Sequence, residues 1–193
     1  MSNVIELDRE THTYTPNLPS VTEILKSVGL IETTFYTEEA RRRGSAVHSA
    51  CEYWDQGDLD EDSVDPAIAG YLQSYIKFRQ VSGFQDPEWI EMPLMSKCGS
   101  YAGTPDRVLI SRPRILLDIK TGPHQYWHKW QGALYLNMLD DPYSFSRFGI
   151  YLKPNGNLPR VHEFPKKEYA ADLAIGLAAV TIYHAKLQNR IKA

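Results

Sequence analysis

Two carboxylates and a lysine lie close together near the middle of the chain, and their types suit chemistry on a metal ion. Asp106 follows Gly103-Thr104-Pro105, and the triplet Asp118-Ile119-Lys120 begins twelve residues after Asp106. Side chains two residues apart on a strand point to the same face, so Asp118 and Lys120 share one face while Ile119 packs on the other. One face of this strand is therefore expected to carry charge.

The pairing of two predicted strands decides whether Asp106 joins that face. A three-residue loop over 111–113 would set Asp106 opposite Asp118, with their Cβ atoms about 5 Å apart. A loop one residue longer would break this pairing unless a bulge restored it, and Pro105 is compatible with a bulge or an edge position. With the shorter loop, two carboxylates occupy one small volume.

Two carboxylates at this distance repel each other, and the pKa of each rises unless a cation lies between them. All-oxygen ligation suits Mg²⁺ or Mn²⁺, which polarises a phosphate oxygen and lowers the pKa of a bound water. Lys120 could position that water, assist its deprotonation or stabilise the developing negative charge. The residues therefore match metal-assisted phosphodiester hydrolysis.

The alternative is that Asp118 and Lys120 form a surface ion pair, which would contribute at most about 1 kcal/mol. The neighbouring residues argue against it, because Ile115-Leu116-Leu117 and Ile119 are apolar, as in a central strand. Charges set in a buried strand need a reason.

Helices and strands that could position these residues alternate along the chain. Caps and apolar spacing predict the helices, and a shift of period towards two from residue 88 predicts three strands in an antiparallel meander. The predicted elements are a hairpin over 3–15, helices over about 21–28, 37–55 and 66–81, strands near 88–95, 101–110 and 114–121, a helix over about 125–139, strands over 148–152 and up to Phe164, and a long helix from Lys166. The apolar stripe of this last helix, expected to pack in the core, is Leu173, Leu177, Val180, His184, Leu187 and Ile191.

Length and composition limit the class of protein. The 193 residues are 42% hydrophobic and 23% charged, which is ordinary globular composition and predicts a single domain over 1–193. Two cysteines, Cys51 and Cys98, are too few for a four-cysteine zinc site or an iron–sulfur cluster. Without an apolar leader or an apolar run of about 18 residues, a cytoplasmic protein with no membrane partner is expected.

The net charge of −3 does not suggest a nucleic-acid partner, but the charge is unevenly distributed. Six of the 24 Asp and Glu residues lie in the segment 55–65, which has no Lys or Arg and predicts a solvated loop. Outside it, 18 acids face 21 bases, a net charge of +3 over 182 residues. DNA is therefore expected on the side away from this segment. The candidate phosphate contacts are Arg41, Arg42 and Arg43, then Lys153, Arg160, Lys166 and Lys167, although either group is also compatible with a solvated face.

The chain resembles the PD-(D/E)XK nuclease superfamily, in the RecB-like exonuclease branch that includes small phage and mitochondrial genome maintenance exonucleases. Pro105-Asp106 and Asp118-Ile119-Lys120 match the defining motif as they stand. The Gly-x-x-x-His and Gln-x-x-x-Tyr helix motifs of the branch occur in the right order, as Gly44 to His48 and Gln131 to Tyr135, and Ser20 to Leu25 resembles the opening of these exonucleases. Together these motifs cover residues 20–135.

The resemblance implies an α/β fold with a restriction-endonuclease-like core: a helix, a three-stranded antiparallel meander, a helix and a further strand. This chain would add an N-terminal hairpin and helices and a long C-terminal helix. His48, Asp106 and Asp118 would bind the metal ion together with the backbone carbonyl of Ile119, and Lys120 would be the catalytic lysine.

The resemblance also implies that Gln131 and Tyr135 hold the DNA near the scissile phosphate. Glu91, on the preceding strand, is a weaker candidate for the acidic rim, and Glu52 is another. Gly44, His48 and Glu52 are four residues apart on one helical face, so the glycine leaves room for substrate or sheet beside His48.

The other histidines and the aromatic residues nearby are explained mainly by structural or surface roles. His124 and His128 are spaced like two zinc ligands, but no third ligand accompanies them, and His162 and His184 are expected to be core or surface residues. Three aromatic residues could stack on single-stranded bases, although core packing is expected for at least two of them: Tyr126, Trp127 and Trp130.

The sequence therefore predicts a Mg²⁺-dependent DNA exonuclease, with Mn²⁺ as a substitute and without an iron–sulfur cluster. It would hydrolyse single-stranded or double-stranded ends to 5′-phosphate products in recombination, repair or end processing, and could be phage-encoded or act with a recombination or replication protein. One alternative is a structure-specific or nicking endonuclease that uses the same site. The other is a non-catalytic DNA-binding or recombination-partner module.

Overall fold

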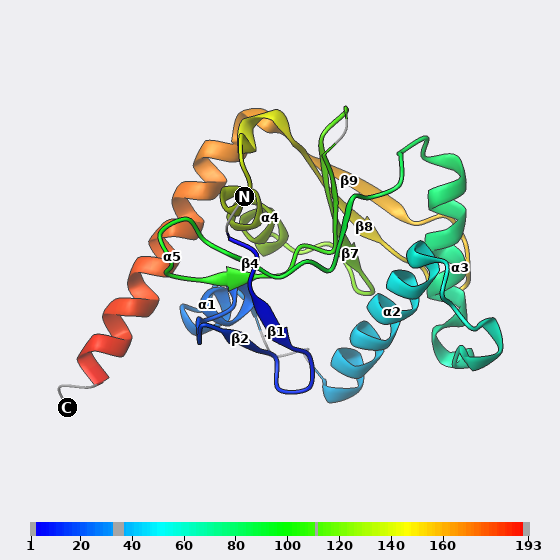
Figure 1. Cartoon of the computed structure of the whole chain (residues 1–193), viewed down its shortest axis with the longest axis horizontal. Helices are drawn as coiled ribbons and strands as arrows, with labels where there is room; N and C mark the ends of the chain where they lie inside the picture. The colour runs from blue at the N-terminus through cyan, green and yellow to red at the C-terminus, as the bar shows by residue number, and fades with distance from the viewer. Residues whose placement is uncertain (1–2, 33–36, 111, 191–193) are drawn as a thin grey trace.

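The computed structural model describes residues 3–32, 37–110 and 112–190, in which helices cover both faces of a five-stranded sheet (Figure 1). The strands lie in the order β3 (Trp89–Ile90), β6 (Arg107–Leu109), β7 (Ile115–Lys120), β8 (Ser146–Tyr151) and β9 (Arg160–Phe164). Only β7 and β8 are parallel, and the helix α4 (Trp127–Met138) supplies the crossover that a parallel pair requires. The prediction of a mixed α/β fold is confirmed.

The alternation of residues in β7 builds two hydrophobic cores. Leu116 and its cross-strand partner Val108 pack with α1 (Val21–Ser27), α4 and α5 (Tyr169–Arg190). The odd-numbered residues of β7, Ile115, Leu117 and Ile119, pack with α2 (Glu38–Gln56) and α3 (Pro66–Val81). Burying one such side chain contributes about 1.5–3 kcal/mol, so both helical layers are fixed by the central strand that carries Asp118 and Lys120.

The first three helices begin at capping residues, close to the predicted positions. The side-chain oxygens of Ser20, Thr37 and Asp65 accept hydrogen bonds from backbone N–H groups in the first turn of α1, α2 and α3. The helix α2 ends at Gly57, whose φ of 76° suits a residue without a Cβ atom. The remaining elements are a hairpin of β1 (Glu6–Asp8) and β2 (Thr13–Thr15), and the short helices η1 (Glu61–Ser63), η2 (Pro142–Ser144) and η3 (Lys166–Glu168).

The three-stranded meander is more broken than the sequence predicts. The predicted strands over 88–95 and 101–110 are each split, because β4 (Leu94–Met95) and β5 (Ala102–Gly103) form a separate two-stranded sheet. The first break lies at Glu91, where φ is 46°, and the second includes Pro105, which has no N–H to donate to a ladder. Ser111, in the predicted loop over 111–113, lies outside the described residues.

The acidic segment 55–65 is not solvated throughout, which corrects the sequence interpretation. Asp55 belongs to α2, its side chain is 1% exposed, and it forms an ion pair with Arg107. The other five acids are exposed: Asp58, Asp60, Glu61, Asp62 and Asp65. Asp55 is therefore neutralised inside the protein and does not belong to an acidic surface.

The predicted stripe of the C-terminal helix is only partly in the core. Val180 is buried, but Leu177 and Leu187 are 37% and 38% exposed, and Ile191 lies outside the described residues. The helix approaches α4 closely at Gly176, where an added Cβ atom would lie 2.8 Å from Leu134, and the neighbouring Leu177 lies on a more exposed side of the helix.

The segment Lys166–Asn189 is the one helix among the described residues that could cross a membrane by length and composition, which the sequence analysis did not anticipate. Here it packs against α4 and α1 along one edge of the molecule (Figure 1). Its Asp172 is buried and paired with Arg147 of β8. These contacts are those of a helix that belongs to the fold.

Candidate metal and catalytic site

The register of β6 and β7 brings Asp106 to Asp118. Arg107 pairs with Leu117 and Val108 with Leu116, so Asp106, which directly precedes β6, comes opposite Asp118 as predicted. The Oδ2 atom of Asp106 accepts the Ile119 N–H at 2.5 Å, which fixes the carboxylate against β7. The two acidic side chains are 8% and 6% exposed, so both lie inside the protein.

Three residues converge closely enough to hold a metal ion. Among the described residues, one such group occurs, and its donor atoms from His48, Glu91 and Asp106 lie within 4.8 Å of one another. The Nδ1 atom of His48 is 3.3 Å from Asp106 Oδ1 and 3.4 Å from Glu91 Oε1. Carboxylate oxygens with one imidazole nitrogen suit Mg²⁺ or Mn²⁺. Glu91, the weaker candidate in the sequence, thus belongs to this group.

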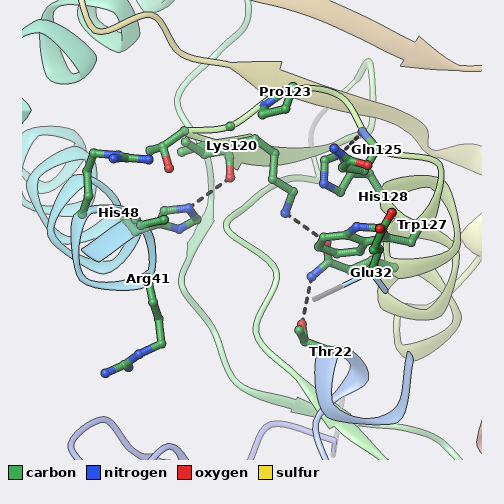
Figure 2. A pocket seen from close by; sticks show the side chains of 16 residues that line it. Thr22, Glu32, Arg41, His48, Lys120, Pro123, Gln125, Trp127 and His128 are labelled. Carbon is green, nitrogen blue, oxygen red and sulfur yellow. Dashed lines mark hydrogen bonds between the residues drawn. The ribbon is translucent and has the colours of Figure 1, made fainter. Parts of the chain in front are cut away.

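The backbone carbonyl of Ile119 also faces the group. It lies 3.0 Å from His48 Nε2, so the histidine spans from α2 to the end of β7 (Figure 2). The two other predicted ligands, Asp118 and Ile119, border this three-residue group without belonging to it. Asp118 is instead engaged by Lys120.

Lys120 is held by a chain of polar contacts that begins at Asp118. Its Nζ atom is 2.6 Å from Asp118 Oδ2 and donates to Gln131 Oε1 at 2.9 Å. The Gln131 amide donates to the Tyr135 hydroxyl at 3.0 Å and to Thr22 Oγ1 at 3.2 Å. Gln131 and Tyr135 are both buried, so the observed contacts of these two residues position Lys120. We call His48, Glu91, Asp106, Asp118 and Lys120 the acid cluster.

The carboxylates of the acid cluster have shifted pKa values. Burial raises the pKa of Asp118 to about 6, against the opposing effect of Lys120 and with a further increase from Asp106. Burial and the charge of Asp106 raise the pKa of Glu91. For Asp106 burial acts to raise the pKa, but His48 and Lys120 outweigh it and lower the pKa. Three largely buried acids therefore lie in one small volume, where burial and their mutual repulsion oppose the charges of His48 and Lys120.

The pKa of His48 is also set by opposing effects of burial and of neighbouring charges. Burial acts to lower its pKa, but Asp106 and Glu91 outweigh burial and raise the pKa well above its ordinary value. Both ring nitrogens face oxygen atoms, as expected for an imidazolium that donates on both sides. A metal ion would take the place of that positive charge.

Two pockets open on the acid cluster. The lysine pocket, of about 420 Å³, lies between α2 and α4 and is lined by Arg41, Arg43, Lys120 and Trp127, among others. Figure 2 shows His48 on one side of it, Trp127 and His128 on the other, and Lys120 between them. The hairpin pocket, of about 460 Å³, lies beside the β1–β2 hairpin and is lined by Arg9, Tyr14 and Glu91, among others.

Gly44 and His48 line both pockets, so the histidine separates two openings. A Cβ atom added at Gly44 would meet only Thr121 Oγ1, at an ordinary 3.7 Å. The sheet therefore does not require a glycine there, and the space beside His48 belongs to the pockets. This favours the first of the two roles expected for Gly44, room for substrate.

The arginine cluster is divided by the structure. Arg41 is exposed and forms an ion pair with Glu38, and Arg42 is exposed but does not line the lysine pocket. The guanidinium of Arg43 lies 5.8 Å from the centre of the Tyr71 ring. Two of the three arginines, Arg41 and Arg43, thus remain candidates for phosphate contacts.

The second basic group is not one cluster. Lys153 and Arg160 lie at one end of the β8–β9 pair, whereas Lys166 and Lys167 follow the other end of β9. A strand of five residues separates them. These four residues therefore do not form a single phosphate-binding patch.

The structure also shows where the remaining candidates from the sequence lie. Trp127 is buried, Trp130 is half-buried and Tyr126 is 78% exposed. His128 accepts hydrogen bonds at Nδ1 from the Gln125 N–H and the Tyr151 hydroxyl, so this nitrogen is not free for zinc. Glu52 is buried and binds Arg9 through two hydrogen bonds, which keeps it apart from the metal-capable group.

Sequence reasoning missed the residues behind the site. Arg107 contacts Asp55 and Glu91, and Thr22 supports Gln131. Asp55 and Arg107 are 52 residues apart, so no local spacing could have linked them. The one available signal was an arginine in an otherwise apolar strand, Arg107-Val108-Leu109.

Neither a scan against protein-family models nor a search of curated proteins finds a match for this chain.

Proposed function

We propose that this protein is a Mg²⁺-dependent DNA exonuclease that leaves 5′-phosphate ends, built on the restriction-endonuclease-like core of the RecB-like PD-(D/E)XK nucleases. The observation that carries the proposal is the meeting of Asp106, Asp118 and Lys120 at one end of two paired strands, beside His48 and Glu91. Nuclease motifs scattered over 88 residues, from His48 to Tyr135, supply neighbouring side chains.

The donor set fits a hard divalent cation. His48, Glu91 and Asp106 would hold it, with Asp118 and the Ile119 carbonyl beside them. When bound, such an ion polarises a phosphate oxygen and lowers the pKa of an attacking water. It would also offset the burial, and the repulsion by Asp106, that now raise the pKa of Glu91 and Asp118.

The protein's own side chains supply the remaining functions. Lys120 is pre-positioned by Asp118 and Gln131, and its ammonium group would stabilise negative charge that develops on the phosphate. Trp127, whose ring centre lies 5.5 Å from Lys120 Nζ, shields this charge from water on one side. Arg41 and Arg43 on the rim of the lysine pocket are placed to contact neighbouring phosphates.

The test is degradation of end-labelled linear DNA, single-stranded and double-stranded, with Mg²⁺ and with EDTA. We expect the wild type to release nucleotides only with Mg²⁺, and Asp118→Ala and Lys120→Ala to be inactive. Asp62→Ala and Lys97→Ala, which change exposed residues of the same types, serve as controls and should keep full activity. Undiminished cleavage by both site variants would sink the assignment.

Covalently closed circular DNA separates the two enzymatic candidates. An exonuclease leaves it intact, whereas cutting or nicking of the circle would favour the structure-specific endonuclease. DNA binding without hydrolysis and without binding of Mg²⁺ would favour the non-catalytic module. A role in recombination, repair or end processing in the cytoplasm belongs to the same proposal and rests on analogy with the family.

A further inference from the structure

Arg107 is fully buried, although it follows Asp106 directly in the chain. Its side chain has 0% exposure, and its place opposite Leu117 directs it towards α2 and α3, on the side of the sheet away from Leu116. The Nε atom lies 2.5 Å from Asp55 Oδ2, and Nη1 lies 3.1 Å from Glu91 Oε1 and 2.6 Å from the Asp106 carbonyl oxygen. One guanidinium thus joins α2, β6 and Glu91, the residue that directly follows β3.

Glu91 needs such a partner because its backbone is unusual. It has a φ of 46°, a region that non-glycine residues adopt only where their surroundings hold them. Its N–H donates to the Asp106 carbonyl oxygen at 3.0 Å, which fixes the backbone, and Arg107 fixes the side chain. The Oε1 atom that Arg107 contacts is the same atom that faces His48 Nδ1.

We infer that Arg107 is a positioning residue that holds the Glu91 carboxylate in the metal-capable group with His48 and Asp106. The inference rests on the proposed function only in requiring that this group bind a divalent ion. Replacing a residue that holds a metal ligand in place typically weakens metal binding by about 10–100-fold. Arg107 provides a rigid planar fork of N–H donors that fixes the geometry of two carboxylates, whereas a lysine is a point charge on a flexible stem.

Arg79 of α3 offers a matched control. Its side chain is 5% exposed, and its ion pairs are with Asp55 and Asp86. Replacing Arg79 or Arg107 disturbs the same buried Asp55, but only Arg107 also contacts Glu91. A purely structural role for Arg107 would therefore give the two variants the same phenotype.

The experiment is calorimetric titration of the full chain with Mn²⁺ in the absence of DNA. We expect Arg107→Gln to bind Mn²⁺ about 10–100-fold more weakly than the wild type, and Arg79→Gln to bind within about twofold of it. Arg107→Lys, which keeps the charge, should fall between. In a Glu91→Gln background, Arg107→Gln should cause no further loss, because its effect passes through Glu91.

Equal Mn²⁺ affinity of the wild type and Arg107→Gln would overturn the inference, as would a wild type that does not bind Mn²⁺. An equal loss of affinity in Arg79→Gln would also overturn it. So would a loss of affinity on adding Arg107→Gln to Glu91→Gln that is as large as the loss in the wild-type background. If Arg107→Gln does not fold, Arg107→Lys decides, and wild-type affinity in that variant overturns the inference. A wild type that binds Mn²⁺ but hydrolyses no DNA would contradict the proposed function and leave the role of Arg107 standing.

Discussion

Two of the buried groups of charged residues in the described part of the chain differ in their balance of charge. Beneath α4 and α5, Arg147 donates to Asp172 Oδ2 at 2.8 Å and to the Lys129 carbonyl oxygen at 2.8 Å, with Lys129 Nζ 3.5 Å from Asp172 Oδ1. We call these three residues the Arg147–Asp172 cluster. The acid cluster instead has three carboxylates facing Lys120 and His48, while Arg107 behind Glu91 is shared with Asp55, and two of these carboxylates, Glu91 and Asp118, have raised pKa values.

The difference teaches which buried charges serve the fold and which serve a site. In the Arg147–Asp172 cluster, every charge has an opposite partner, and the pair ties α5 to the sheet. In the acid cluster, repulsion is retained although apolar residues would pack there at lower cost. Shifted pKa values of this kind gather at functional sites.

The largest expected effect distinguishes the two lysines. Lys120→Ala should lower the rate of Mg²⁺-dependent DNA hydrolysis by about 10²–10³-fold, because the ammonium group that faces the phosphate is lost. Lys129→Ala, which also removes a lysine paired with a buried aspartate, should leave the rate unchanged. Single-turnover assays of both variants provide the comparison. Equal rates for the two variants would remove the distinction between the clusters.

The fold should depend on the Arg147–Asp172 cluster much more than on the acid cluster. Arg147→Met removes the closer partner of the buried Asp172 and leaves Lys129 at 3.5 Å, so the free energy of unfolding should fall by up to about 3–5 kcal/mol. Urea denaturation would measure this loss. A loss below about 1 kcal/mol would show that this pair does not stabilise the fold.

Removing a charge from the acid cluster should instead increase the free energy of unfolding. Because burial raises the pKa of Asp118 to about 6, its ionised form destabilises the metal-free fold at pH 7. Asp118→Asn should therefore raise the free energy of unfolding by about 1–3 kcal/mol at pH 7 in EDTA.

The pH dependence of that gain tests its cause. The folded state binds the extra proton below about pH 6 and the unfolded state only near pH 4, so the wild type recovers stability as the pH falls through this window. Urea denaturation at pH 5 and pH 7 should show the advantage of Asp118→Asn shrinking at the lower pH. An advantage that is absent at pH 7, or independent of pH, would contradict the charge imbalance.

The smallest effect concerns His128, which lies beside Lys120 and should give the opposite pH dependence. Burial, together with the charge of Lys120, lowers the pKa of His128 to about 2. Near pH 6.5 the unfolded state binds a proton at His128 that the folded state does not bind. As the pH falls below 6.5, the free energy of unfolding should therefore decrease by up to about 1.4 kcal/mol per pH unit. His128→Gln should flatten this slope in denaturation curves, and an unchanged slope would show that His128 is not its source.

The sequence was sufficient for the helices and for the register at the site. Caps at Ser20, Thr37 and Asp65 are local signals, and the pairing of Asp106 with Asp118 followed from a short loop and a period of two. The motif residues meet because α2, β6, β7 and α4 carry them to one place, and these elements lie close to predicted ones, although two predicted strands are split.

What the sequence could not provide depends on long-range contacts. The break of the meander at Glu91 depends on its hydrogen bond to Asp106 and its ion pair with Arg107, neither of which is visible in local spacing. Asp55 begins an acidic segment that has the composition of a loop, but its charge is neutralised by Arg107, 52 residues further along the chain. The helix α5 approaches α4 closely at Gly176, which the stripe of large apolar residues does not reveal.

The central claim is that the acid cluster holds a divalent metal ion. Crystals soaked in Mn²⁺ test it most directly, because anomalous scattering locates the ion without an assay. We expect a peak among His48, Glu91 and Asp106 in the wild type, and its loss in crystals of Asp106→Asn. A map with no peak at these residues, or a peak that persists in Asp106→Asn, would contradict the claim.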